Sequence, residues 1–282
     1  MKKYLTTFIL ACAVSIASVA QNSDTTQHHH HFKIVKNGSF YGSWGYNEET
    51  YTNSNLYVVQ PGMNNNYAFT NIQAQDHIGW DRLFNAQLTI PQYNYRLGYF
   101  FDEKQEWGIE LNFDHTKYVV LQGYNVIVNG TLHGRSVDTT VNINNSTLRY
   151  QLNNGANFFL FNIVRRIKIF STRDGKIKLD GLIKVGVGPL IPHVDNEIFG
   201  DQNRKQFQLG GWNMGTEATL KLTLFKHVYL EYCNKLDYAC YSWLEIYGGR
   251  AHQNFGTYEN IANIGYTFHL NAKKYPLPPT GK

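Results

Sequence analysis

Side chains that could bind a metal or act in catalysis are few and widely spaced along the 282 residues. Adjacent histidines in a flexible arm can hold Zn²⁺, Cu²⁺ or Ni²⁺. One such run lies near the N-terminus, at His28, His29, His30 and His31. A disordered linker is the favoured interpretation of this run, so we expect no metal site and no cofactor.

Other histidines and acids lie in or beside the long loops that are predicted below: Asp76 with His77, Asp81, His193 with Asp195, and His252. A Ser-His-acid mechanism needs the base and the nucleophile within hydrogen-bond reach. His193 and Asp195 share a face of an extended chain, but no His-x-Ser-Asn motif of the lipid A deacylases is present. We therefore predict no catalytic residue and interpret these as solvated loop residues.

The composition favours strands joined by polar loops. Aromatic residues make up 15% of the chain and charged residues 17%, against roughly 25% charged residues in an average soluble protein. This excludes a disordered chain, which is highly charged and poor in aromatics. The net charge is +5 without a basic stripe, so a nucleic-acid partner is not expected.

Apolar and polar residues alternate with a period of two, which is the pattern of a strand with one apolar face. In 89–101, Tyr93, Tyr95 and Leu97 share a face opposite Asn94 and Arg96. The pattern recurs to give eight predicted strands, at 38–47, 89–101, 107–114, 157–170, 177–188, 212–224, 228–233 and 262–270.

The connections between these strands alternate in length. Short turns are predicted at 102–106, 171–176 and 225–227, and long loops at 48–88, 117–156, 189–208 and 239–257. Transmembrane β-barrels have this alternation, with long loops outside and tight turns in the periplasm. The predicted fold is therefore all-β, an antiparallel up-and-down transmembrane barrel of eight strands with four long extracellular loops. A count of ten to twelve strands is an alternative, as is a soluble sandwich or lipocalin-like barrel.

The polar faces carry charges at mid-strand, which a soluble core would not tolerate, whereas an eight-stranded barrel is just wide enough for side chains to fill it. We therefore expect a salt-bridged interior. A narrow conduit, or catalysis in the interior, is the alternative. The predicted inward residues are four cations and five acids: Arg96, Lys178, Lys184, Lys221, Glu110, Asp114, Asp180, Glu217 and Glu231. Alternation places His115 outward, at the level of lipid headgroups.

Residues 1–20 have the features of a secretory signal, with Lys2 and Lys3 before an uncharged apolar stretch and small residues before Gln21. Cys12 stands too early in that stretch to end a lipoprotein signal. The predicted organisation is a signal peptide (1–20), a flexible arm (21–37), a barrel (38–270) and a periplasmic tail (271–282).

Two cysteines follow the signal, Cys233 and Cys240. Seven extended positions span roughly 23 Å, and a disulfide needs Cα atoms within about 4.4–6.8 Å. We predict two free thiols, with Cys233 in the interior and Cys240 near the outer rim.

The stretch 263–270, Asn-Ile-Gly-Tyr-Thr-Phe-His-Leu, is similar to the C-terminal insertion signal of small outer-membrane β-barrels of Gram-negative bacteria. Residues 89–120 also resemble an uncharacterised group of such barrels from Bacteroidetes-type bacteria. The resemblance implies an outer-membrane location, lipid and lipopolysaccharide as partners, and contact of 263–270 with the barrel-assembly machinery. We expect a non-enzymatic structural or surface-binding protein, with a rim enzyme that modifies lipid A or a small-solute channel as alternatives.

Overall fold

The computed structural model describes residues 38–77, 92–102, 104–152 and 155–270. Their secondary structure is strand, apart from turns and one 3-10 segment, η1 (Pro61–Met63). No helix in these ranges is long and apolar enough to cross a membrane. The predicted signal peptide, the arm with its four histidines, the C-terminal tail and Asp81 lie outside the described residues.

Eight strands close into a ring, in which every neighbouring pair is antiparallel and the first strand pairs with the last. In ring order they are β1 (Ser39–Tyr51), β5 (Tyr93–Phe100), β6 (Trp107–His115), β11 (Phe158–Ser171), β12 (Ile177–Leu190), β16 (Gly211–Leu224), β17 (Val228–Ile246) and β18 (Gly249–His269). The predicted antiparallel barrel is confirmed, with eight strands in the ring, although the described residues contain more strands than the eight predicted.

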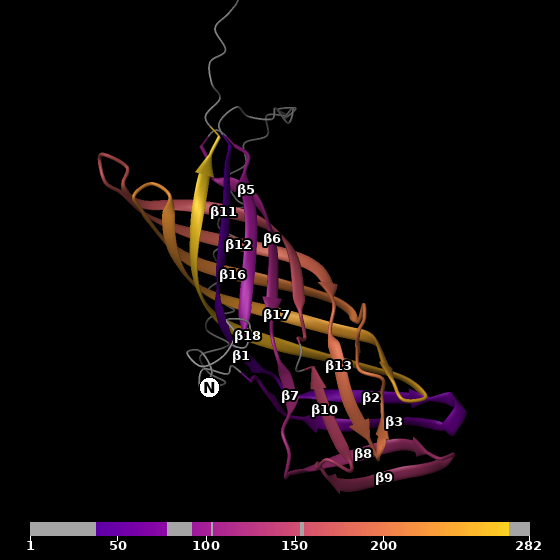
Figure 1. The fold of residues 1–282 in the computed structure, drawn as a ribbon. Helices are drawn as coiled ribbons and strands as arrows, with labels where there is room; N and C mark the ends of the chain where they lie inside the picture. The colour runs from indigo at the N-terminus through magenta and orange to yellow at the C-terminus, as the bar shows by residue number, and fades with distance from the viewer. Residues whose placement is uncertain (1–37, 78–91, 103, 153–154, 271–282) are drawn as a thin grey trace, which may run out of the picture. The chain divides into compact units, whose positions relative to one another are not determined.

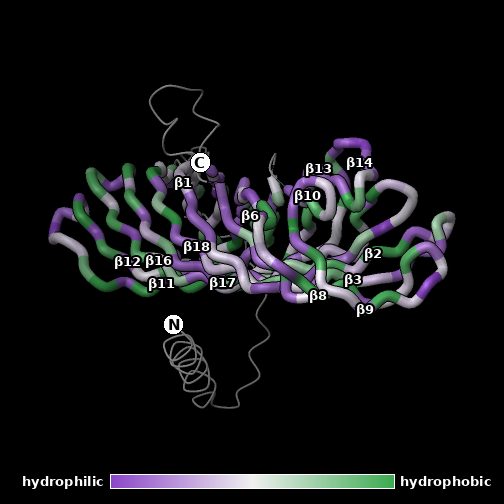
Figure 2. The backbone as a smooth tube through the Cα atoms, turned by 90° about the horizontal axis from the view of Figure 1, so that it is seen from below, coloured by the Kyte–Doolittle hydropathy of each residue, from purple (hydrophilic) through white to green (hydrophobic). Residues whose placement is uncertain are grey.

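The wall of this barrel has apolar side chains outside and polar side chains inside. Figure 2 shows hydrophobic and hydrophilic residues alternating along the barrel strands. Leu97, Ile163 and Leu220 are more than half exposed on the outer surface, whereas Arg96, Lys184 and Glu217 are buried. A soluble barrel would have the opposite arrangement. The fold is therefore that of a transmembrane antiparallel up-and-down barrel.

The short turns and the ends of the barrel sequence lie at one end of the ring. The turns follow β5, β11 and β16, and β1 begins where β18 ends, since Ser39 pairs with His269. Figure 1 shows the remaining strands gathered at the opposite end of the barrel. We call these remaining strands, with the outer parts of β17 and β18, the head.

The head consists of two sheets with a hydrophobic core between them, where the sequence predicts only polar loops. One sheet extends from β18 through β2, β3, β8 and β9, and the other contains β14, β13, β10, β7 and β4, with β15 paired to β13. The bounds are β2 (Ser54–Gln60), β3 (Asn65–Ile72), β4 (Ala74–Gln75), β7 (Tyr118–Val120), β8 (Asn125–Leu132), β9 (Arg135–Asn142), β10 (Leu148–Leu152), β13 (His193–Ile198), β14 (Asp201–Gln202) and β15 (Gln206–Phe207).

The core of the head buries side chains from both sheets, among them Leu56 and Phe69 from the first sheet and Tyr118, Leu148 and Val194 from the second. Burying each such side chain contributes about 1.5–3 kcal/mol. The expectation of generic polar loops at 48–88, 117–156 and 189–208 is therefore wrong for the described parts of those segments.

The prediction of a fourth long loop, at 239–257, is also wrong. β17 continues to Ile246 and β18 starts at Gly249, so only Tyr247 and Gly248 turn the chain. The physical reason is that the strand pairs directly with its neighbour: Tyr241 faces Gln253, and after a bulge Leu244 faces Ala251. Cys233 and Cys240 lie on this one continuous strand as free thiols, buried and half-buried respectively, as predicted.

Candidate functional site

The register of the sheet places charges of opposite sign side by side in the barrel interior. Lys184 on β12 faces Glu217 on β16, Glu217 faces Lys235 on β17, and Lys235 faces Glu259 on β18. Glu259 in turn faces Glu49 on β1. All five side chains are buried, with exposed fractions of at most 4%. Five neighbouring strands thus contribute one continuous row of charged groups to the interior.

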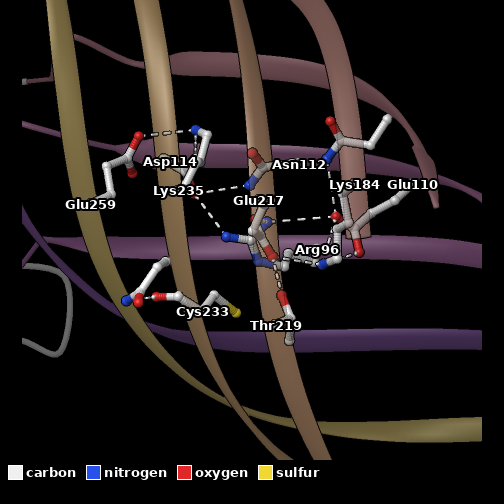
Figure 3. A network of polar contacts seen from close by, with 12 residues as sticks. Arg96, Glu110, Asn112, Asp114, Lys184, Glu217, Thr219, Cys233, Lys235 and Glu259 are labelled. Atoms are coloured by element: carbon white, nitrogen blue, oxygen red, sulfur yellow. Dashed lines mark hydrogen bonds and ion pairs between the residues drawn. The ribbon is translucent and has the colours of Figure 1, made fainter. Parts of the chain in front are cut away.

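Two ion pairs cross the interior from one side of the barrel to the other. The Nη1 atom of Arg96 on β5 lies 2.8 Å from Oε2 of Glu217 on β16. The Nζ atom of Lys235 on β17 lies 2.6 Å from Oδ2 of Asp114 on β6. In each pair the two strands are four steps apart around the ring of eight in either direction. They are therefore opposite one another, and the side chains meet at the centre, as Figure 3 shows.

Glu110 joins the remaining charges of this layer. Its carboxylate accepts hydrogen bonds from Lys184 Nζ at 2.9 Å and 3.1 Å and from Tyr41 Oη at 2.8 Å. Asn162 Nδ2 donates to the same carboxylate at 3.1 Å. Lys184 also lies 3.0 Å from Glu217. Because the side chains of Arg96, Glu110, Lys184 and Glu217 touch one another, removal of any one leaves a buried charge with fewer partners.

Lys235 is the cation of the outer half of the interior. Its Nζ atom lies 2.6 Å from Asp114, 3.0 Å from Glu259 and 3.1 Å from Asp237. Asn213 Nδ2 donates to Asp237 at 3.2 Å. Three carboxylates thus share this ammonium group, and Asp114 also lies 3.7 Å from Arg96 Nη2.

An aromatic layer lies between this network and the short-turn end. Tyr41, Phe100, Val164, Leu182 and Tyr229 form a buried cluster there. The rings of Tyr41 and Tyr229 can lie directly against the neighbouring strand because a glycine faces each ring. A Cβ atom at Gly98 would lie 2.1 Å from Tyr41, and one at Gly265 would lie 2.2 Å from Tyr229.

The cations nearest this aromatic layer are paired with carboxylates or with aromatic rings. Lys221 Nζ lies 3.3 Å from the centre of the Tyr229 ring and 3.4 Å from Glu231 Oε1. The Nε atom of Arg166 lies 3.8 Å from Asp180 Oδ2.

The structure divides the predicted interior residues into two groups. One is the central network of Arg96, Glu110, Asp114, Lys184 and Glu217, and the other contains Asp180, Lys221 and Glu231 towards the short-turn end. Lys178 is half-buried at the rim. On the eight strands of the ring, sequence reasoning missed five of the buried charges that the structure describes: Glu49, Arg166, Lys235, Asp237 and Glu259.

A signal for two of these, Lys235 and Asp237, was present, because the inward alternation Glu231, Cys233, Lys235, Asp237 continues without interruption. In the described parts of the eight ring strands, the buried charges comprise five cations and eight acids: Arg96, Arg166, Lys184, Lys221, Lys235, Glu49, Glu110, Asp114, Asp180, Glu217, Glu231, Asp237 and Glu259. The predicted near-balance of charge is replaced by an excess of acid.

The histidines and acids considered for catalysis make structural contacts in the head and at its base. The ring of His193 packs edge-on against Phe207. Asp195 is 2.9 Å from Arg149 and 2.8 Å from Lys205, and His252 stacks on Tyr57. These groups do not come together into one site.

Two other candidates lie where the head meets the barrel. His115 stacks on Tyr93, and its Nδ1 atom is 2.9 Å from Asn157 Oδ1. Asp76 accepts the backbone N–H of Glu49 at 2.9 Å, and its partial burial raises the pKa of its carboxyl above the ordinary value. Within the described ranges, no group of three or more His, Cys, Asp or Glu side chains is arranged to hold a metal ion.

Comparison with known proteins gives a weak structural likeness. No family model matches the chain, and no curated protein matches it. Among solved structures, the attachment invasion locus protein Ail of Yersinia pestis is 13% identical, with 82% of this chain and 99% of that chain covered and a TM-score of 0.30. The outer membrane protein OprG of Pseudomonas aeruginosa is 10% identical, with 83% and 96% covered and a TM-score of 0.36.

The outer membrane protease OmpT of Escherichia coli is 7% identical, with 86% of this chain and 100% of that chain covered and a TM-score of 0.39. At these identities and scores the likeness says nothing about activity. The resemblance to Bacteroidetes-type barrels stays a prediction.

Proposed function

We propose that this protein is an integral outer-membrane β-barrel that holds a folded head at the cell surface. In this proposal the barrel interior is closed, and the protein acts by binding through the head, neither conducting solutes nor carrying out catalysis. The apolar outer wall supports insertion in a lipid bilayer, and the signal predicted at 1–20 supports export.

The observation that carries this proposal is the pair of ion bridges across the interior. Arg96 with Glu217 and Lys235 with Asp114 occupy the centre of a barrel that is only wide enough for side chains. Breaking such a buried pair is costly, because each partner is left as an uncompensated charge. A solute pathway would require both bridges to open, so the interior is better suited to holding the wall rigid.

The head supports a binding role for a different reason. Its core fixes the positions of the strands that carry the outermost turns, so those turns present a defined surface. Lipopolysaccharide and membrane lipid around the rim are the partners we propose for the wall. The segment 263–270 would contact the assembly machinery through Ile264, Tyr266 and Phe268, which are exposed on the outer wall.

Conductance in planar bilayers tests the closed interior. The wild-type protein should give no discrete current steps under conditions in which a general porin does. A variant that lacks the central bridge, Arg96→Ala with Glu217→Ala, should conduct if its heat-dependent gel migration shows that it folds. Stable current steps from the wild-type protein would refute the closed interior.

Surface labelling tests the orientation. An epitope inserted at Asn64–Asn66 or at Gly248–Gly249, in turns of the head, should bind antibody on intact cells. The same epitope at Lys104–Gln105, in the short turn after β5, should bind only after the outer membrane is opened. Equal labelling of both ends on intact cells would contradict the proposal.

A further inference from the structure

A basic cavity lies at the short-turn end of the barrel, outside the interior network. It has a volume of about 450 Å³ and is lined by Asp174, Gly175, Lys178, Lys226, His227 and His269. These residues come from the turn between β11 and β12, from β12, from the turn between β16 and β17, and from the end of β18, which Figure 1 shows at the same end of the barrel.

The cations of this cavity are available to a ligand. Within the part of the chain that the structure describes, neither Lys178 nor Lys226 forms an ion pair. The single carboxylate among the lining residues, Asp174, is already engaged, with its Oδ2 atom 3.2 Å from Lys176 Nζ and its Oδ1 atom accepting from Thr172 at 2.8 Å. The cavity therefore presents an excess of positive charge.

The two histidines are held in place by backbone carbonyls. His227 Nδ1 lies 3.0 Å from the carbonyl oxygen of Thr267, so Nδ1 is the donor and Nε2 is left for another partner. His269 Nε2 lies 3.4 Å from the carbonyl oxygen of Lys226, and the two rings are 5.5 Å apart. The ring of His227 also stacks on Tyr266. One N–H of each ring is therefore already taken by a carbonyl, and the ammonium groups of Lys178 and Lys226 are the donors that an anion with several oxygens would meet.

The turn that supplies Lys226 has an unusual backbone. Phe225 and Lys226 have φ angles of 52° and 71°, and His227 N–H bonds to the carbonyl of Leu224 at 3.2 Å. This is the pattern of a two-residue hairpin turn that favours Asn-Gly. A bulky residue at positive φ is a genuine outlier, and the turn after β11 places Gly175 at its positive φ instead. Phe225 and Lys226 thus occupy positions where Asn and Gly are favoured, which points to a role for their side chains.

Exposed apolar side chains surround the same rim. Phe225 is 75% exposed and Phe268 is 59% exposed, and Ile177 and Leu270 are more than 40% exposed. A ligand with a phosphate group and acyl chains matches both features, because its phosphate would meet the cations while its chains lie against the apolar wall. Basic pockets at a membrane surface bind anionic lipid headgroups in this way.

We propose that this cavity binds the phosphate group of an anionic phospholipid in the periplasmic leaflet. The leaflet follows from the orientation given under the proposed function, whereas the phosphate chemistry follows from the cavity alone. Lys178 and Lys226 supply the charge and the N–H donors, and Phe225 packs beside an acyl chain.

Native mass spectrometry of the full mature protein, folded in a neutral detergent, tests the proposal. Phosphatidylglycerol should remain bound as an adduct, and phosphatidylcholine should not. Lys178→Gln with Lys226→Gln should weaken phosphatidylglycerol binding about 30-fold, as expected for two lysines at an anionic lipid surface. The matched control, Lys104→Gln with Arg173→Gln, removes the same charge from the same rim outside the cavity and should change binding less than twofold.

A second variant separates binding from folding. Phe225→Asn with Lys226→Gly restores the residues that the turn prefers, so the barrel should unfold no more easily than the wild type while lipid binding falls. Wild-type lipid binding by this variant would overturn the proposal, and so would an equal loss of binding in the Lys104 and Arg173 control.

Inorganic phosphate provides the last comparison. If inorganic phosphate competes only weakly with phosphatidylglycerol, the ligand is the lipid. If inorganic phosphate binds and phosphatidylglycerol does not, the assignment of a membrane lipid as the ligand is wrong. Surface labelling judges the orientation independently. Lipid binding with reversed labelling would refute the proposed function alone, whereas correct labelling without lipid binding would refute only this inference.

Discussion

Replacement of Lys235 by methionine is the sharpest test of the interior network. The substitution keeps most of the volume of the side chain and removes its charge. Three carboxylates, on Asp114, Asp237 and Glu259, would then lose an ammonium group that lies within 3.1 Å of each. All three are buried, so water cannot replace the lost partner without entering the barrel.

The size of the effect follows from these distances. At an effective dielectric constant of about 20, two unit charges 3 Å apart attract by roughly 5–6 kcal/mol. Desolvation of the charges offsets much of this, and breaking a buried pair from one side typically costs about 3–5 kcal/mol. Since three acids share this lysine, we expect Lys235→Met to destabilise the barrel by about 5 kcal/mol.

Reversible unfolding by guanidinium in lipid vesicles, followed by tryptophan fluorescence and by heat-dependent gel migration, measures this loss. Lys168→Met is the matched control, because its side chain is 55% exposed and its nearest acid, Glu106, is 4.0 Å away. That change should cost no more than about 1 kcal/mol. If Lys235→Met also costs less than about 1 kcal/mol, the bridges across the interior do not hold the barrel together.

Three further changes test other parts of the structure. Leu222→Arg places a charge on the lipid-facing wall, where Leu222 is 36% exposed, and should cost about 2–4 kcal/mol in vesicle unfolding experiments; normal folding would show that the inward and outward faces are assigned wrongly. Gly98→Ala would bring a methyl group within 2.1 Å of Tyr41 and should lower stability by about 1–3 kcal/mol, as the guanidinium midpoint would show. Burial raises the pKa of Asp195, but hydrogen bonds from Lys205 and Arg149 outweigh it and hold that pKa below the ordinary value. The stabilisation is therefore present above about pH 4 and is lost as the pH falls through the lowered pKa. Asp195→Asn should cost about 0.5–1 kcal/mol at pH 7 and progressively less as the pH falls below about 4, and a cost that does not change with pH would refute the ion pair.

The sequence was sufficient to predict the barrel wall because each wall strand has an apolar environment on its outer side and a polar interior on the other. Tyr95, Leu97 and Ile109 face outward, and Arg96 and Glu110 face inward. Such a contrast repeats every second residue and is visible locally. The bridges across the interior were beyond this reasoning, because they depend on which strands lie opposite each other when the ring closes.

The head was missed for a related reason. In β2, Leu56 and Val58 are buried while Tyr57 and Val59 lie on the exposed face. Both faces therefore carry apolar side chains, and no alternation distinguishes this strand from an irregular loop. The strands of the head are also short, and β4, β14 and β15 contain two residues each. Their stability depends on packing between distant segments, which no local pattern records.

The change in polarity along β17 and β18 indicates where the barrel ends and the head begins. Along β17 the inward charges are Glu231, Lys235 and Asp237, and the inward residues are apolar from Ala239 onward. Along β18 they are apolar at Phe255 and charged at Glu259. A lipid-facing wall needs its polar groups inside, whereas a head in water needs an apolar core. The two strands change from one arrangement to the other at the same level, since Asp237 pairs with Thr257.

Tyr238 and Tyr258 are exposed on the outer surface at this level, and tyrosines favour the membrane–water interface. We therefore predict that the bilayer boundary nearest the head lies at these two residues.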